Sequence, residues 1–193
     1  MARPREFDEA SALDAAVGHF WLHGYQSTSV RELAAAMGIT GASLYNAFGD
    51  KRALFKMALA RYIETSIEGR VIRKHHSTVR AIDAFFKDVV NYSLKDKDRK
   101  GCLLVNSALE LGDDGAELKG VVSDVFVEIE VFFKRAIARG QEQGEVSTEL
   151  PASDLARLLL GALLGIRVLA RVRPDRALLE GIVRSALVTL MVY

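Results

Sequence analysis

The chain has 193 residues, of which half are hydrophobic and only three are prolines. This composition excludes a disordered chain and favours helices, because proline breaks the helical hydrogen-bond ladder. The single cysteine excludes an intramolecular disulfide and a cysteine-rich zinc site, and it indicates a reducing, cytoplasmic location. The net charge of +1 opposes a broad basic surface, so binding of nucleic acid would require a local patch. Charged residues interrupt the first 20 residues and the apolar run 155–170, so we expect neither a secretion signal nor a membrane span.

Four helices are predicted in the first third of the chain. An apolar stripe over residues 7–22 ends before Gly24, a residue type that commonly follows a helix. Ser29 and Glu32 have the spacing of a capping box, which predicts a second helix from Ser29 to Gly38. Thr40 is expected to cap a short third helix that ends near residue 47, and Asp50 is expected to cap a fourth helix. Two helices joined by a tight glycine turn are typical of a helix-turn-helix unit, although ordinary helical hairpins share this pattern.

Five further helices are predicted after residue 74. Apolar residues recur at helical spacing within residues 82–90, 102–111, 122–137, 155–172 and 177–192. Gly140 and Gly144 are expected to end the longest of these helices, and no segment alternates as a strand does. The sequence therefore predicts an all-α fold of about nine helices. We expect a three-helix N-terminal helix-turn-helix domain over residues 1–50, a connecting helix over 51–66, and a second helical domain over 67–193.

The predicted third helix has an unusual outer face. If Leu44 and Phe48 pack inward, the residues left outside carry no charge and are small or able to form hydrogen bonds: Thr40, Gly41, Ala42, Ser43, Tyr45 and Asn46. A solvated helix usually carries lysine and glutamate at such positions. Small side chains let a backbone approach a DNA groove, and asparagine and serine pair with base edges.

Candidate phosphate ligands surround this face. Ser29 lies at a helix N-terminus, Tyr45 has a hydroxyl donor, and Lys51 follows the third helix. The alternatives are that Tyr45 is a core aromatic residue and that Lys51 is a solvated charge. Arg3 and Arg5 either reach the DNA backbone or minor groove, or they belong to a disordered tail.

Residues 25–62 closely resemble the DNA-binding domain of TetR-family repressors. The resemblance includes Gly24-Tyr25 just before and at its start, and the matching segments are Thr28-Ser29-Val30-Arg31-Glu32-Leu33-Ala34, Met37-Gly38-Ile39-Thr40, Ser43-Leu44-Tyr45-Asn46-Ala47-Phe48 and Lys51-Arg52-Ala53-Leu54. It implies that the third helix is the recognition helix, that Tyr45 and Lys51 bind phosphates, and that Ser29 caps against the DNA backbone. Ala47 stands where the family usually has histidine, so we expect one backbone contact to be missing.

The last two predicted helices are strongly apolar and contain the small residues Gly161, Ala162 and Gly165, which allow close helix approach. The resemblance, supported by the segment Gly165 to Arg171, implies that this helix pair forms a homodimer through a four-helix bundle. The alternative is that both helices belong entirely to an internal core. A dimer would place two recognition helices about one DNA turn apart.

The resemblance also implies a ligand cavity among the middle helices. Its candidate lining residues are aromatic or polar, namely Phe86, Tyr92, Asn106, Phe126 and Phe133, although an aromatic stripe at helical spacing is more often plain core. Cys102 is a further candidate, because a helix N-terminus and the nearby Lys97 and Lys100 are expected to lower a thiol pKa. It is interpreted either as a sensor of thiol-reactive compounds or as a small buried hydrophobic residue.

These observations predict a DNA-binding transcriptional regulator, most simply a repressor that leaves a palindromic operator when a small molecule or thiol-reactive compound engages the second domain. The expected partners are double-stranded operator DNA, a small-molecule effector and a second copy of the chain, with no cofactor and no membrane. Metal-ligand spacing, a catalytic triad and a glycine-rich phosphate loop are all missing from the sequence, which opposes an enzyme. An architectural DNA-binding protein is opposed by the near-neutral charge.

Overall fold

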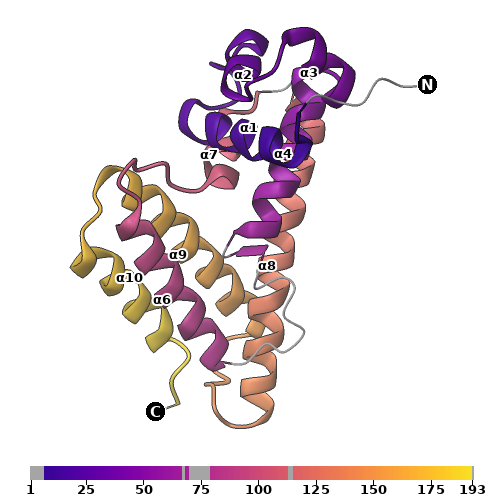
Figure 1. The fold of residues 1–193 in the computed structure, drawn as a ribbon. Helices are drawn as coiled ribbons and strands as arrows, with labels where there is room; N and C mark the ends of the chain where they lie inside the picture. The colour runs from indigo at the N-terminus through magenta and orange to yellow at the C-terminus, as the bar shows by residue number, and fades with distance from the viewer. Residues whose placement is uncertain (1–6, 67, 70–78, 113–114, 193) are drawn as a thin grey trace.

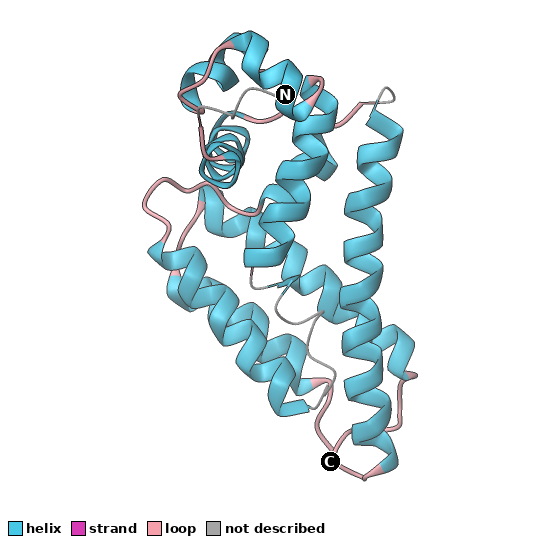
Figure 2. Ribbon diagram, turned by 45° about the vertical axis from the view of Figure 1, so that its right-hand side comes forward, coloured by secondary structure: helices cyan, strands magenta, loops and turns pink. Residues whose placement is uncertain are grey.

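The computed structural model describes residues 7–66, 68–69, 79–112 and 115–192 (Figure 1). Over this part of the chain the labelled elements are nine helices and no residue forms a strand (Figure 2), which confirms the predicted all-α class. The first four are α1 (Glu9–His23), α2 (Val30–Ala36), α3 (Gly41–Phe48) and α4 (Lys51–Thr65). They are followed by α6 (Val79–Lys95), α7 (Leu103–Glu110), α8 (Ala116–Glu142), α9 (Ala152–Val172) and α10 (Arg176–Val188).

The N-terminal helices begin where the sequence provides a capping side chain. The predicted capping box is present: the Ser29 hydroxyl accepts from the Glu32 amide, and the Glu32 carboxylate accepts from the Ser29 amide. Thr40 caps α3, and the Asp50 carboxylate caps α4 by accepting from the Ala53 amide at 2.8 Å. These bonds satisfy amides that have no partner inside a helix. The start of each helix is therefore fixed by local sequence.

Glycines form the turns between these helices. Gly24 ends α1 with a φ of 83°, as predicted, and Gly38 follows α2 with a φ of 67°. Both values lie in the left-handed region, which other residues enter only at a cost. The turn at Gly38 directs α3 across α2, so that α2 and α3 lie at one end of the molecule (Figure 1).

An apolar core holds the N-terminal helices together. Phe20 of α1 and Phe55 of α4 are fully buried, and their rings meet edge-on with centroids 4.7 Å apart. Leu33 of α2 and Leu44 of α3 are also fully buried in this cluster. Because α1 packs along α4, this core also fixes α2 and α3 relative to the rest of the chain.

The remaining helices form a layered bundle in which α8 packs along α9, while α6 contacts α8, α9 and α10 (Figure 1). The prediction that Gly140 ends the long helix is wrong, since α8 continues to Glu142 and Gly140 is buried inside it. A Cβ at Gly140 would lie 2.6 Å from a Val146 methyl carbon, so this glycine serves close packing. None of the helices in the described ranges is long and apolar enough to cross a bilayer.

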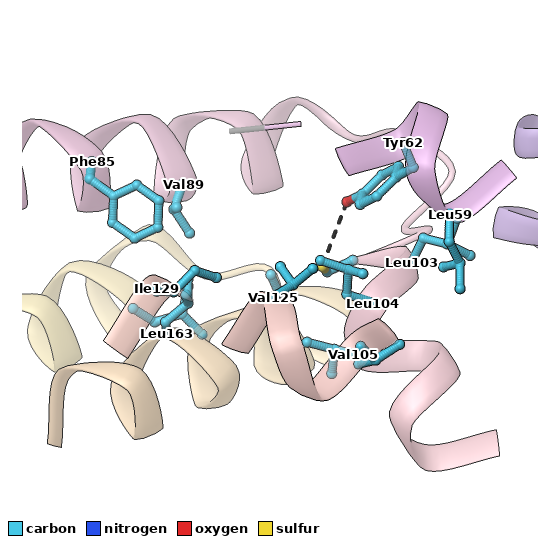
Figure 3. Packing of buried hydrophobic residues seen from close by; sticks show 14 of the residues in the cluster. Leu59, Tyr62, Phe85, Val89, Leu103, Leu104, Val105, Val125, Ile129 and Leu163 are labelled. Carbon is cyan, nitrogen blue, oxygen red and sulfur yellow. Dashed lines mark hydrogen bonds between the residues drawn. The ribbon is translucent and has the colours of Figure 1, made fainter. Parts of the chain in front are cut away.

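Specific polar contacts join the N-terminal helices to the bundle. The Glu110 carboxylate at the end of α7 accepts from the backbone amides of Tyr25 and Gln26, at 2.9 and 2.5 Å. Lys56 of α4 pairs with Glu117 of α8. Figure 3 shows the apolar side of the same junction, where Leu59 of α4 lies near Leu103 and Leu104 of α7. A movement of α7 or α8 would therefore displace α4 and the segment that follows α1 through these contacts.

Candidate functional site

The outward face of α3 carries the residues that the sequence singled out. Thr40, Ala42, Tyr45 and Asn46 are exposed, while Gly41 and Ser43 are half-buried. Tyr45 exposes 55% of its surface, so it is not a core aromatic residue. Leu44 and Phe48 are buried on the opposite side of the helix and hold this face outward. The Thr40 and Ser43 hydroxyls lie 2.9 Å apart and bond to each other.

Lys51 lies at the first position of α4, beside the C-terminal end of α3. Its ammonium group sits 4.4 Å from the centre of the Tyr25 ring, a cation–π geometry. Burial lowers the pKa of Lys51, and the charges of Glu110 and Glu32 act in the opposite direction. Lys51 is thus a half-buried, positioned cation rather than a freely solvated one. Tyr25 is a positioning residue that sequence reasoning missed, because nothing local connects it to Lys51.

Ser29 is exposed at the N-terminus of α2, but its hydroxyl is engaged. It donates to the Glu32 carboxylate at 2.6 Å as well as accepting from the Glu32 amide. The bond from the hydroxyl, and a second one from the Ser29 backbone amide, lower the pKa of the Glu32 carboxyl. An anion at this helix end would have to displace or share the Glu32 contacts. Arg3 and Arg5 lie outside the described residues.

A second feature is an open groove of about 940 Å³ along α9 and α10. Small and apolar residues line much of it, among them Leu158, Gly161, Ala162, Leu178 and Ile182. Leu158 is 45% exposed. Three more apolar residues of this helix pair or of the segment just after it are also more than 40% exposed, namely Val168, Val188 and Met191. An apolar surface of this kind typically marks an interface.

A buried polar cluster lies where α4, α6, α7 and α9 approach one another. Arg167 of α9 and Glu68 are each only 2% exposed and form an ion pair, and Arg167 also donates to the Ser93 hydroxyl. Burial disfavours the charged guanidinium and is the largest single influence, but Glu68, together with Cys102 and Tyr62, more than offsets it and keeps the pKa of Arg167 above its usual value. The Tyr62 hydroxyl donates to the Cys102 sulfur at 3.6 Å (Figure 3). The Cys102 sulfur lies 4.0 Å from a Glu68 oxygen.

Cys102 is placed as predicted but has the opposite chemistry. It is the N-cap residue of α7, yet it is 2% exposed and its side chain caps no amide. Burial raises the pKa of the thiol, and the Glu68 charge raises it further, while Arg167 only partly compensates. The expectation of a lowered thiol pKa is therefore wrong. Desolvation outweighs the helix dipole and the neighbouring lysines because the sulfur lies inside the core.

The candidate lining residues have different surroundings within the described part of the chain. Phe86 and Phe133 stack with ring centroids 5.8 Å apart, and of the six candidates only Phe86 lines the groove of about 330 Å³ between α6 and α10. Tyr92 is 42% exposed, and its ring faces the Arg167 guanidinium at 5.8 Å. The Asn106 amide donates to the Lys100 carbonyl, and Phe126 is half-buried against the core. The sequence analysis thus selected Cys102 and Tyr92, which lie beside the buried cluster, but it did not select Glu68 and Arg167, the ion pair at the centre of the cluster.

The architecture defines the class of protein first: a helix-turn-helix unit with an outward, uncharged second helix, attached to a helical bundle. Residues 12–58 match the family model of the bacterial regulatory proteins of the tetR family, and residues 78–186 match the tetracyclin repressor-like C-terminal domain. The chain belongs to the TetR family of bacterial transcriptional regulators. It is accordingly a helix-turn-helix DNA-binding regulator and not an enzyme.

Individual relatives match over nearly the whole chain. It is 34% identical to the uncharacterized HTH-type transcriptional regulator YezE of Bacillus subtilis (strain 168), over 91% of this chain and 92% of YezE. It is 28% identical to the HTH-type transcriptional repressor ComR of Escherichia coli (strain K12), over 99% of this chain and 91% of ComR. Among solved structures, a cysteine mutant of the TetR-family regulator CifR in complex with 26-bp double-strand operator DNA superimposes with a TM-score of 0.86 at 30% identity, covering 98% of this chain and 100% of that one.

Proposed function

We propose that the chain is a homodimeric repressor that binds a palindromic operator and releases it when an effector engages the helical bundle. The observation that carries this proposal is the outward α3 face, with Tyr45 exposed and Lys51 positioned beside it. ComR is described as a repressor, and the CifR mutant was crystallised on operator DNA. Both relatives support the same activity for this chain.

In the proposed complex, α3 of each protomer enters a major groove. Thr40, Gly41, Ala42, Ser43 and Asn46 face the base edges, while Tyr45 and Lys51 bind phosphates and Ser29 contacts the backbone. The small side chains at Gly41 and Ala42 allow the close approach that base contacts require. We infer that this DNA-binding domain comprises residues 1–50 and that α4 links it to the domain formed by residues 67–193.

The groove along α9 and α10 supports dimerisation through these two helices. An exposed apolar helix pair in a regulator that reads a palindrome is best covered by a second copy, since a two-fold axis reproduces the symmetry of the operator. Small residues at Gly161 and Ala162 would allow the helices of two protomers to approach closely. The recognition helices would then be held about one DNA turn apart.

Effector release is proposed as a population shift. An effector that favours a dimer with wrongly spaced recognition helices lowers operator affinity, and the DNA lowers effector affinity by the same factor. The contacts of Glu110 with Tyr25 and Gln26, and of Lys56 with Glu117, offer a physical link between bundle and DNA-binding domain. Of the two triggers, the buried and protonated Cys102 favours a non-covalent small molecule over a thiol-reactive compound.

The test is operator binding with a matched tyrosine pair. Footprinting on the promoter of the gene itself identifies the palindrome, and fluorescence anisotropy then measures affinity. We expect Tyr45→Phe to weaken binding about tenfold or more, because a hydrogen bond to a charged phosphate is lost in each protomer. Tyr92→Phe, which changes an exposed tyrosine outside the DNA-binding domain, should bind as the unaltered protein does. Uniform coating of DNA, or equal affinity of both variants, would refute the proposal.

A further inference from the structure

The Glu68 carboxylate is buried in an asymmetric way. Among the described residues only one of its oxygens, Oε1, has partners: the Nε and Nη2 of Arg167 donate to it at 2.8 and 2.5 Å, and the Cys102 sulfur lies 4.0 Å from it. An arginine and a carboxylate commonly form two parallel bonds, one to each oxygen. Here both guanidinium donors meet the same oxygen. The second oxygen, Oε2, is left to other partners.

No donor reaches Oε2 from the part of the chain that the structure describes, and this oxygen is buried. A buried, charged acceptor without a hydrogen bond is costly, and native proteins rarely leave one unfilled. The Nη1 of Arg167 is directed elsewhere, since it donates to the Ser93 hydroxyl at 3.1 Å. Among the described residues, Oε2 is therefore an unfilled acceptor position that a donor on a bound molecule could occupy.

The charges of the cluster restrict what that molecule can be. Glu68 and Arg167 neutralise each other, so a buried cation would add an uncompensated charge. An anion would be repelled by the negative charge of the Glu68 carboxylate, whose Oε2 can only accept a hydrogen bond. An uncharged group with a hydrogen-bond donor meets neither penalty. The Tyr62–Cys102 contact beside Glu68 lies among buried apolar side chains that include Leu103, Leu104 and Val125 (Figure 3), which suits a small alcohol with a hydrocarbon body.

We propose that Glu68 is the polar anchor of the effector, and that its Oε2 accepts a hydrogen bond from the hydroxyl of a small, uncharged alcohol. The regulatory part of this inference rests on the proposed function. Glu68 follows α4, whose C-cap is Ser66, and Arg167 belongs to α9. A molecule bound at the Glu68–Arg167 pair therefore contacts the segment just after α4, the helix that leads to the DNA-binding domain, and α9, which is proposed to form the dimer.

The experiment compares alcohols with their methyl ethers on the full-length protein. The probes are primary alcohols from 1-butanol to benzyl alcohol, each paired with the ether that lacks the donor. Binding is followed through Trp21, the only tryptophan, whose ring meets that of Tyr62 at 4.9 Å. We expect at least one alcohol to bind about tenfold or more tightly than its ether, because only the alcohol donates to Oε2. Equal affinities, or no binding by any probe, overturn the proposal.

Glu68→Gln provides the decisive variant. Its amide oxygen is expected to stay towards Arg167, which turns the free position into a donor, so the preference for alcohol over ether should fall to about one. Ser93→Ala removes a neighbouring hydroxyl without changing Oε2 and should keep the preference. If Glu68→Gln does not fold, a crystal structure with the best alcohol decides: a hydroxyl on Oε2 supports the proposal, and an ordered water alone overturns it. Operator binding without probe is measured separately, so that its loss counts against the proposed function and not against this site.

Discussion

Lys51 is the residue whose role in DNA binding can be isolated most cleanly. It is held over the Tyr25 ring at the start of α4, so its charge lies beside the recognition helix in a defined place. We expect Lys51→Gln to reduce the slope of log affinity against log salt by about 2 per dimer, because each phosphate contact releases roughly one counterion. Titrations of operator DNA between about 50 and 200 mM salt measure the slope.

A matched lysine serves as the control for that experiment. Lys87 of α6 is exposed and pairs with Asp83 one helical turn earlier, far from α3 in the sequence and fold. Lys87→Gln changes the net charge by the same amount and should leave the salt slope unaltered. A similar loss of slope in both variants would mean that Lys51 acts through overall charge and not through a phosphate contact.

Cys102 gives a prediction about pH. Its thiol pKa is raised, first by burial and then by Glu68, so the folded protein holds the thiol protonated at neutral pH. Alkylation by iodoacetamide should be slow at pH 7 and should rise about tenfold per pH unit towards pH 9 without levelling off, since the thiolate is the nucleophile. Mass spectrometry reads the rate directly because this is the only cysteine. A plateau below pH 8 would contradict the raised pKa.

The unfolded chain provides the reference for Cys102. In urea its alkylation rate should level off near pH 8.5, the ordinary range of a thiol. Since the folded pKa lies above this value, the buried thiol contributes its full stability below about pH 8.5 and loses it as the pH rises through the folded pKa. Denaturation of the folded protein should therefore become easier on the alkaline side.

At the scale of elements, the Glu68–Arg167 pair ties the segment after α4 to α9. Both residues are 2% exposed, so removing one partner leaves the charge of the other unpaired in the core. Arg167→Met is expected to lower the free energy of unfolding by about 3–5 kcal/mol, whereas Glu68→Met combined with Arg167→Met should recover most of the loss. Urea denaturation of both variants measures the difference. If the double variant is as unstable as the single one, packing at Arg167 matters more than its charge.

At the scale of the whole molecule, the parts that local sequence determines were predictable. The caps at Ser29, Thr40 and Asp50 depend on residues three positions away, and the α3 face follows from helical periodicity. The buried cluster depends on tertiary contacts: Arg167 and Glu68 are 99 residues apart. Arg167 did leave a visible signal, a charge within an apolar helix, which indicates a buried partner. The chemistry of Cys102 was mispredicted because burial, which no local pattern specified, dominates it.

Dimerisation determines whether the two recognition helices act together, and Leu158 is the residue that tests it. It is 45% exposed and lines the groove along α9 and α10. We expect Leu158→Glu to yield a folded monomer, because two like charges would be buried at the interface. Without the second half-site contact, operator affinity should fall by about 100-fold or more. Sedimentation velocity gives the oligomeric state, and anisotropy gives the affinity.

Val127→Glu is the matched control, because it changes a 54% exposed valine of α8 outside that groove. This variant should remain dimeric and keep its operator affinity. A dimeric Leu158→Glu variant with full operator affinity would place the interface elsewhere on the molecule.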